Sequence, residues 1–277
     1  MTNGSTRPPQ DAGSILRVAN IAKTYVTPKS SVVAIDDVSF EVDEGELVCI
    51  VGPSGCGKTT LLKMLSGLLK PTSGAISLNG KNIDGPPREM ALVFQDYSRS
   101  LYPWMRVARN VEFPLKDRTT IPAAEKKDRV RDALASVGLT GFEESYPWQL
   151  SGGMQQRVAI ARALAYRPDI LLMDEPFASV DAQTRSDLED LVLSLKHRYG
   201  MTILFVTHDI DESVYLADRV VILTNRPTRV DQTLDVDLPH PRDQVATKEL
   251  PEFAHLRAHV YTAIKKMARA TTSVDAR

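Results

Sequence analysis

The sequence lacks the features of a secreted, membrane-spanning or nucleic-acid-binding protein. Its 277 residues hold only two cysteines, Cys49 on a predicted buried strand and Cys56 in a glycine-rich loop. We therefore expect no disulfide and a cytosolic compartment. No apolar run approaches the roughly 20 residues that a membrane-spanning helix needs. With 34 lysines and arginines against 35 aspartates and glutamates, the formal net charge of −1 gives no indication of nucleic-acid binding.

The N-terminal residues also lack the apolar segment of a signal peptide. Residues 1–14 are mostly polar, and we expect them to form a disordered leader. Apolar residues make up 43% of the chain, which is enough for a sizeable core. Length alone permits one large domain or two small ones.

The segment VCIVGPSGCGKTTLL reads as an apolar strand, a glycine-rich turn and the start of a helix. It contains the pattern GxxxxGK[ST] of a phosphate-binding loop. The backbone N–H groups of such a loop converge at a helix N-terminus, where the helix dipole favours an anion. Lys58 would reach the β- and γ-phosphates, and the Thr59 hydroxyl would contact Mg²⁺. The predicted nucleotide-binding residues of the loop are Gly52, Pro53, Ser54, Gly55, Cys56, Gly57, Lys58, Thr59 and Thr60.

Strand and helix patterns around this loop predict an α/β fold. Leu16–Ile21 and Ala34–Val42 indicate a half-exposed antiparallel sheet, whereas Glu46–Val51 indicates a strand buried on both faces. After Pro168, strands and helices alternate, which indicates a parallel sheet with crossover helices. The other elements predicted here are a helix at Lys58–Leu68, strands at Ser73–Asn79, Glu89–Phe94, Ile170–Met173, Thr202–Val206 and Arg219–Thr224, and helices at Ala182–Tyr199 and Asp209–Ala217.

Two regions depart from this alternation. Between Gln95 and Tyr166 strand signals vanish, and prolines separate helical segments. We interpret about 96–166 as a helical subdomain inserted into a domain that spans 15–226. Residues 227–277 read as a proline-rich, charged tail. The predicted helices of the two regions are Val107–Phe113, Ala123–Val137, Gly152–Tyr166 and, in the tail, Glu252–Met267.

The run ILLMDE predicts a strand that ends in two acids, Asp174 and Glu175. Ligands bind at the carboxyl ends of parallel strands, so both acids should face the phosphate-binding loop. We expect Asp174 to hold Mg²⁺, directly or through water, and Glu175 to act as general base on the attacking water. A strand followed by an ordinary surface turn would show the same acidic pair. Its position about 115 residues after a phosphate-binding loop favours the catalytic interpretation.

The motif LSGGMQQR opens a predicted helix, with Ser151 as its N-cap. It resembles the signature motif of ATP-binding-cassette (ABC) ATPases. The resemblance implies a P-loop NTPase (RecA-like) core with an antiparallel β subdomain and an inserted helical subdomain. It also implies a head-to-tail dimer, in which ATP lies between the loop of one copy and Ser151, Gly152 and Gly153 of the other. A capped helix N-terminus with two glycines suits a γ-phosphate.

Other residues match the family pattern, which covers about Leu16 to Leu223. The resemblance implies that Gln95 contacts Mg²⁺ and the attacking water, and that His208 contacts the γ-phosphate. Asp181 ends a segment similar to the D-loop, which touches the second subunit, although its spelling Ser-Val-Asp departs from the usual Ser-Ala-Leu-Asp. Tyr25 is similar to the aromatic residue that stacks on adenine, but an ordinary strand-end tyrosine would read the same way.

Longer segments narrow the resemblance to one branch of the family. FQDYSRSLYPWMRVARNVEFPL, VTHDIDESVYLADRVVILTNRP and the tail resemble nitrate, sulfonate and taurine importer ATPases. One phosphate-binding loop and one signature indicate a single cassette that must pair with a second copy. The resemblance implies a peripheral position on the cytoplasmic face of the inner (cell) membrane. It further implies a separate transmembrane permease and, indirectly, a periplasmic or lipoprotein solute-binding protein as partners.

Other functions remain open at this point. An ABC ATPase could serve lipid transport or efflux, and the transported solute is not decided by the sequence. Soluble ABC ATPases of DNA repair or translation usually carry tandem cassettes, a long coiled-coil insertion or a basic face, and none is visible here. A small-molecule kinase or GTPase would share the phosphate-binding loop but would leave LSGGMQQR unexplained. The tail of about 50 residues is shorter than the regulatory domain of maltose-type importer ATPases.

The segment from Gln95 to Trp104 is unusually aromatic for a chain with 6% aromatic residues. Tyr97, Leu101, Tyr102 and Trp104 either pack inside the helical subdomain or form a docking surface. By resemblance, a short cytoplasmic helix of the permease would sit in the cleft beside Gln95. We therefore expect replacement of Tyr97 or Tyr102 by alanine to uncouple transport from ATP hydrolysis.

Overall fold

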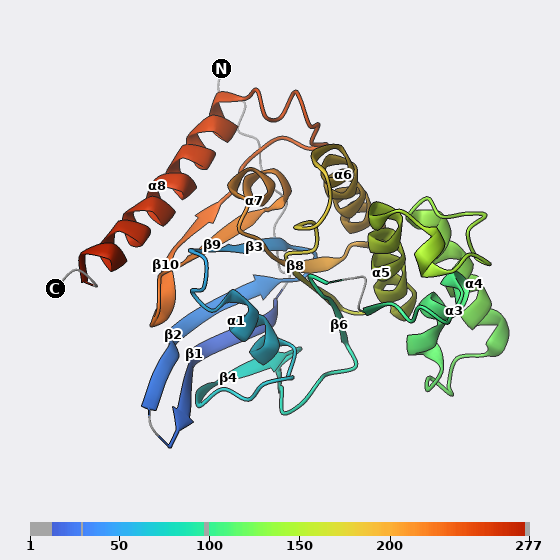
Figure 1. Cartoon of the computed structure of the whole chain (residues 1–277), viewed down its shortest axis with the longest axis horizontal. Helices are drawn as coiled ribbons and strands as arrows, with labels where there is room; N and C mark the ends of the chain where they lie inside the picture. Colours follow the sequence, from blue (N-terminus) through green and yellow to red (C-terminus); the bar gives the residue numbers. More distant parts are fainter. Residues whose placement is uncertain (1–12, 29, 97–99, 275–277) are drawn as a thin grey trace.

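A ten-stranded sheet runs through the computed structural model, which describes residues 13–28, 30–96 and 100–274 (Figure 1). The strands are β1 (Ser14–Thr27), β2 (Ser30–Asp43), β3 (Leu47–Val51), β4 (Ser73–Leu78), β5 (Lys81–Asn82), β6 (Met90–Val93), β7 (Ile170–Asp174), β8 (Thr202–Val206), β9 (Arg219–Leu223) and β10 (Thr228–Asp235). Their order across the sheet is β5-β4-β1-β2-β10-β9-β3-β8-β7-β6.

The half of the sheet from β9 to β6 is parallel, as the sequence predicts. Every residue of β3, β7 and β8 is buried, because helices or loops cover both faces of these strands. Parallel strands end at the same edge of a sheet. The residues that follow β3, β7 and β8 therefore emerge side by side, and this edge carries the candidate site.

The helices are α1 (Lys58–Leu65), α3 (Val107–Glu112), α4 (Ala123–Ser136), α5 (Gly152–Tyr166), α6 (Ala182–Tyr199), α7 (Ile210–Leu216) and α8 (Pro251–Val274), with short 3₁₀ turns at Phe113–Leu115 and Pro147–Gln149. Helix α1 ends three residues before its predicted end. Gly67 adopts a left-handed conformation (φ 71°) and donates to the Met64 carbonyl, which closes the helix. Helix α8 is longer than predicted at both ends.

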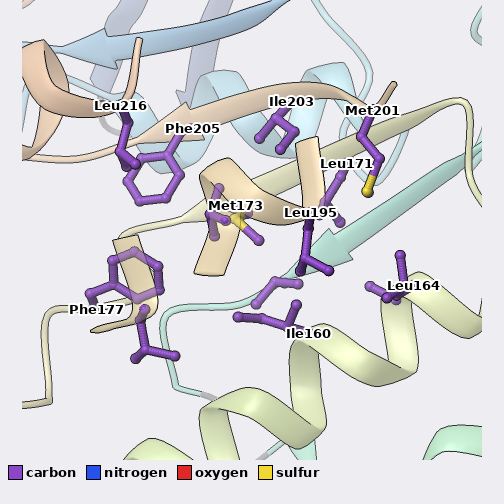
Figure 2. Close-up of a cluster of buried hydrophobic side chains, with 14 of the residues drawn as sticks. Ile160, Leu164, Leu171, Met173, Phe177, Leu195, Met201, Ile203, Phe205 and Leu216 are labelled. Carbon is purple, nitrogen blue, oxygen red and sulfur yellow. The ribbon is translucent and has the colours of Figure 1, made fainter. Parts of the chain in front are cut away.

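A large part of the core lies between the sheet and the helices α5 and α6 (Figure 2). Ile160 of α5 and Leu195 of α6 face Met173 of β7. Nearby, Phe177 packs edge-on against Phe205 of β8, with ring centroids 5.4 Å apart. The loop that follows β7 is thus anchored by a buried aromatic ring only two residues beyond Glu175.

The antiparallel half contains β1, β2, β4 and β5. Strands β1 and β2 extend several residues beyond the predicted ranges and form a long hairpin. Asn20, with φ 48°, interrupts the ladder between Val18 and Ile21. The exposed part of the hairpin beyond this irregularity escapes a pattern-based prediction because few of its side chains are buried.

Strand β10 was not predicted. It pairs antiparallel with β9 and parallel with β2, so it joins the two halves of the sheet, and the sheet continues past residue 226. Its inward positions alternate with exposed ones, starting from the fully buried Thr228. Only two of its inward residues, Val230 and Leu234, are aliphatic, which is why the segment reads as a polar tail. The period of two was its only signal.

Helices α3, α4 and α5 gather beyond β6 at one end of the sheet, whereas α8 lies along α7 and β10 at the other (Figure 1). Among the residues that the structure describes, no helix combines the length and the apolar character that a membrane crossing requires.

Candidate nucleotide-binding site

The predicted phosphate-binding loop connects β3 to α1. Gly55 and Gly57 both adopt positive φ angles, 75° and 115°, which L-residues with side chains rarely take. Lys58 opens α1 and is buried, and its Nζ donates to the carbonyl oxygens of Gly52 (3.0 Å) and Pro53 (3.4 Å). The lysine side chain therefore folds back over the loop, with its ammonium group directed at the centre of the turn.

A hollow of about 360 Å³ opens above this loop. It brings together loop residues, the acid that follows β7 and the histidine that follows β8. The residues that line it are Ser54, Gly55, Gly57, Lys58, Thr59, Thr60, Glu175, His208 and Arg226. The sequence predicts all of these except Arg226.

Glu175 and His208 are joined across the hollow. His208 Nδ1 lies 2.8 Å from Glu175 Oε2, and Lys58 Nζ lies 3.9 Å from Glu175 Oε1. The backbone of Glu175 has φ 43°, a left-handed conformation that costs on the order of 1–3 kcal/mol for a residue other than glycine. Its N–H donates to Val206 O of β8 (2.8 Å). The carboxylate is thus held in place from both its backbone and its side chain.

Asp174 is buried below the hollow, at the end of β7. Burial raises the pKa of its carboxyl, and a hydrogen bond with the Thr59 side chain acts in the opposite direction. Asp174 Oδ1 is buried and has no hydrogen-bond partner among the described residues. A carboxylate with an unsatisfied buried oxygen beside a threonine hydroxyl is an oxygen donor set of the kind that Mg²⁺ prefers. The residues present therefore fit this ion.

The signature and D-loop residues meet one another rather than the hollow. Ser151 caps α5 by accepting from the Met154 N–H (3.3 Å), and Asp181 caps α6 by accepting from the Thr184 N–H (3.0 Å) and hydroxyl (2.7 Å). These hydrogen bonds lower the pKa of the exposed Asp181. A Cβ atom on Gly153 would lie 2.4 Å from Thr184 Cγ2, so the glycine permits this close approach. Thr184 was not singled out from the sequence.

The predicted site residues that do not line this hollow are Tyr25, Gly52, Pro53, Cys56, Gln95, Ser151, Gly152, Gly153, Asp174 and Asp181. Tyr25 is 43% exposed on β1. Gln95 is exposed and follows β6, whose last pair joins Val93 to Met173, so it leaves the sheet close to Asp174.

Cys56 is buried within the loop. Burial raises the pKa of its thiol, although the nearby charge of Lys58 lowers it. The protonated thiol packs close to Gly52, where an added Cβ atom would lie 3.0 Å from both Cys56 Sγ and Leu223 O. Cys56 therefore supports the loop by packing and does not present a reactive thiolate.

A second feature missed from the sequence is a set of buried carboxyl groups behind Glu175 and His208. Glu212 of α7 faces a small space lined also by Arg185, Thr207 and Asp209. Burial raises the pKa of Glu212 to about 8, a hydrogen bond with Thr207 lowers it, and the charge of Glu189 raises it further. A glutamate in a helix that begins just after His208 looks like an ordinary solvent-facing residue in the sequence, and nothing in the local pattern predicts its burial.

Known proteins resemble this chain over most of its length. The family model described as ABC transporter matches residues 35–178. An uncharacterised ABC transporter ATP-binding protein of Methanocaldococcus jannaschii is 46% identical over 250 residues, which cover 90% of this chain and 91% of that protein. Two proteins of Synechococcus elongatus are also similar. The bicarbonate transport ATP-binding protein CmpD is 43% identical, covering 87% of each chain, and the nitrate import ATP-binding protein NrtD is 44% identical, covering 86% of each.

Solved structures agree with these relatives. A dimeric ATP-binding cassette in a post-hydrolysis state, bound to ADP and Pi, is 33% identical with a TM-score of 0.69, covering 80% of this chain and 98% of that one. CbiO1 of Clostridium perfringens, part of an ABC transporter complex, is 30% identical with a TM-score of 0.72, covering 80% and 89%. Together with the phosphate-binding loop, the paired Glu175 and His208 and the capped signature helix, these likenesses show that the chain belongs to the ABC transporter family and has the fold of its ATPase cassettes.

Proposed function

We propose that this chain is the ATP-hydrolysing subunit of an importer that takes up a small solute, in the manner of nitrate, sulfonate or taurine importers, through a separate permease. The observation that carries the proposal is the hollow in which the phosphate-binding loop, Lys58, Glu175 and His208 meet. The similar CmpD and NrtD are named for bicarbonate and nitrate transport, which supports a small inorganic or oxyanionic solute.

Within the hollow, each residue has a distinct chemical task. Glu175, held by His208 and by its own backbone, is placed to accept a proton from the attacking water. The loop N–H groups and the N-terminus of α1 bind phosphate oxygens, and Lys58 adds a full positive charge. His208 donates toward the γ-phosphate in the same arrangement.

We further propose that Thr59 and Asp174, with Gln95 nearby, hold Mg²⁺ when nucleotide is bound. The ion would supply charge neutralisation to the β- and γ-phosphates. Tyr25 stands on the exposed hairpin, where it is free to stack on adenine.

The exposed signature residues support a head-to-tail dimer of two copies. Because Ser151, Gly152 and Gly153 do not line the hollow of their own chain, they are free to contact ATP bound to a second copy. ATP would then stabilise the closed dimer by touching both chains, and hydrolysis would release it. The dimer would work at the cytoplasmic face of the membrane, bound to the permease and served indirectly by a solute-binding protein.

The permease is expected in a cleft of about 820 Å³ between the sheet and the helical region. Tyr102 and Phe113 line it together with Phe94, which is 45% exposed. Of the four residues proposed for docking, Leu101 is buried and belongs to the core, which corrects its assignment, and Trp104 is 70% exposed. Tyr97 lies outside the described residues, so its docking role stays a prediction.

Reconstitution tests this function directly. The purified chain, co-expressed with the permease encoded beside it, is placed in liposomes together with the solute-binding protein. We expect ATP-dependent uptake of labelled nitrate, sulfonate or bicarbonate, and no uptake when the chain carries Glu175→Gln. ATP-dependent extrusion of a lipid or drug instead would favour the efflux alternative. ATP hydrolysis without any stable association with a permease would favour a soluble ABC ATPase.

A further inference from the structure

One cation of the hollow belongs to none of the motifs considered above. Arg226 lines the hollow beside Lys58 and is exposed. Within the described part of the chain, no carboxylate lies at ion-pair distance from its guanidinium group, whereas Arg229, three residues later, pairs with Asp36. The positive charge of Arg226 is therefore available to an anion that enters the hollow.

The chain on both sides of Arg226 is firmly attached. Two residues later, the hydroxyl of the fully buried Thr228 contacts the carbonyl oxygen of Cys56 in the phosphate-binding loop. One residue earlier, Asn225 Nδ2 donates to Met267 O of α8 (2.7 Å). Arg226 thus extends from a short segment held between the loop and α8, and this fixes the point from which its guanidinium reaches the hollow.

The sheet order tells from which side Arg226 approaches. It connects β9 to β10, which lie on one side of β3. Glu175 follows β7 and His208 follows β8, and both strands lie on the other side of β3. A nucleotide bound over the end of β3 would therefore have the hydrolytic pair on one flank and Arg226 on the opposite flank.

We propose that Arg226 binds a phosphate oxygen of the nucleotide on the flank opposite Glu175, and so contributes to nucleotide affinity rather than to the attack of water. This rests on the proposed function, because it requires a nucleotide in the hollow. A guanidinium group suits the task because it presents several N–H donors in one plane and stays charged at any physiological pH. Because the contact lies away from the attacking water, ATP and ADP share it.

The test compares the full-length chain with Arg226→Gln, Arg226→Lys and the matched control Arg229→Gln. Calorimetric titration with ATP and, separately, with ADP gives dissociation constants, and a steady-state assay of phosphate release gives KM and kcat. For Arg226→Gln we expect both nucleotides to bind about tenfold more weakly, the size expected for loss of one charge-assisted hydrogen bond. KM should rise by a similar factor, and kcat at saturating ATP should change less than twofold. Arg226→Lys should lie in between, and Arg229→Gln should bind like the wild type.

Equal weakening by Arg226→Gln and Arg229→Gln, or no weakening by either, would overturn the proposal. A loss confined to ATP, with ADP affinity unchanged, would overturn it too, since it would place Arg226 on the γ-phosphate. A fall in kcat without a change in KM would assign the residue to the hydrolytic step. If the wild-type chain bound no nucleotide, the proposed function itself would fail, which the wild-type titration shows before any variant is measured.

Discussion

At the scale of single residues, Glu175 combines a strained backbone with a hydrogen-bonded carboxylate. Replacing it by glutamine preserves the shape and an oxygen that can accept from His208 but removes the proton acceptor. For Glu175→Gln we expect ATP binding to persist while turnover falls by roughly 10²-fold or more, the magnitude of general-base catalysis. The variant should accumulate as an ATP-bound dimer in gel filtration, with the exposed Glu252→Gln as a matched control. Turnover close to that of the wild type in a folded variant would remove Glu175 from this role.

The buried Glu212 makes stability depend on pH. Its pKa of about 8, raised by burial, lies above its ordinary value of 4.5, so between these values the folded chain holds a proton that the unfolded chain has lost. The stabilisation is fully present below about pH 4.5 and is lost as the pH rises through about 8. Glu212→Gln cannot ionise and should avoid this loss.

Thermal unfolding from pH 5 to pH 8 measures this difference. The melting temperature of Glu212→Gln should gain on that of the wild type steadily as the pH rises, and exposed Glu252→Gln should not. An offset between variant and wild type that stays constant over the whole range would mean that Glu212 does not bind a proton on folding. Thr207, Glu189, Asp209 and Arg185 face the carboxyl and set its titration.

At the scale of elements, the sequence predicted best where one strong period controls a segment. Strands β3, β7 and β8 are continuous apolar runs between turns, and the acid or histidine that follows each is fixed at one sheet edge by parallel pairing. This is why the phosphate-binding loop, Glu175 and His208 could be placed together in advance. Arg226 could not, because it stands in a connection whose position depends on how β10 pairs with two distant strands.

Strand β10 also supports the phosphate-binding loop, which gives a prediction for Thr228. Its buried hydroxyl contacts Cys56 O and donates to Ala34 O (2.9 Å). Thr228→Val removes the donor and leaves buried carbonyl oxygens with one partner fewer, so we expect a loss of about 1–3 kcal/mol in the free energy of unfolding by urea. ATP affinity should fall as well, because the loop loses a fixed point.

Thr228→Ser separates the hydrogen bond from the packing. It keeps the hydroxyl and removes one methyl group, so it should lose about 1 kcal/mol of stability while retaining ATP affinity close to that of the wild type. If serine and valine weakened ATP binding to the same extent, the methyl group rather than the hydroxyl would be what supports the loop.

At the scale of the whole molecule, the nucleotide edge and the proposed permease cleft are connected through β6. The chain leaves the sheet after Val93, passes Gln95 and returns at Leu101, which is buried in the core of the helical region. Tyr102 follows at the rim of the cleft. Closure of two cassettes around ATP would therefore move the cleft together with the helical region, as a rigid element biased by ligand.

Tyr102→Ala tests this coupling. The Tyr102 ring lies 4.5 Å from the centroid of Phe113 and 5.6 Å from that of Trp104, and faces the cleft. Its backbone is held independently, because the buried Asn110 accepts from Tyr102 N (2.8 Å) and donates to Tyr102 O (3.1 Å). Loss of the ring should therefore leave the path of the chain intact. We expect ATP hydrolysis by the purified subunit to be largely preserved, while permease pull-down and reconstituted transport are lost.

The matched control is Trp148→Ala, which removes another exposed aromatic ring of the helical region, one that stacks on Tyr146 and does not line the cleft. This variant should keep both hydrolysis and permease binding. A parallel loss of hydrolysis and binding in Tyr102→Ala would show that the ring belongs to the core, since an internal defect would reach the nucleotide edge through β6. Full binding by Tyr102→Ala would place the docking surface elsewhere, because a ring at the rim of an apolar cleft contributes to affinity only if the partner covers it.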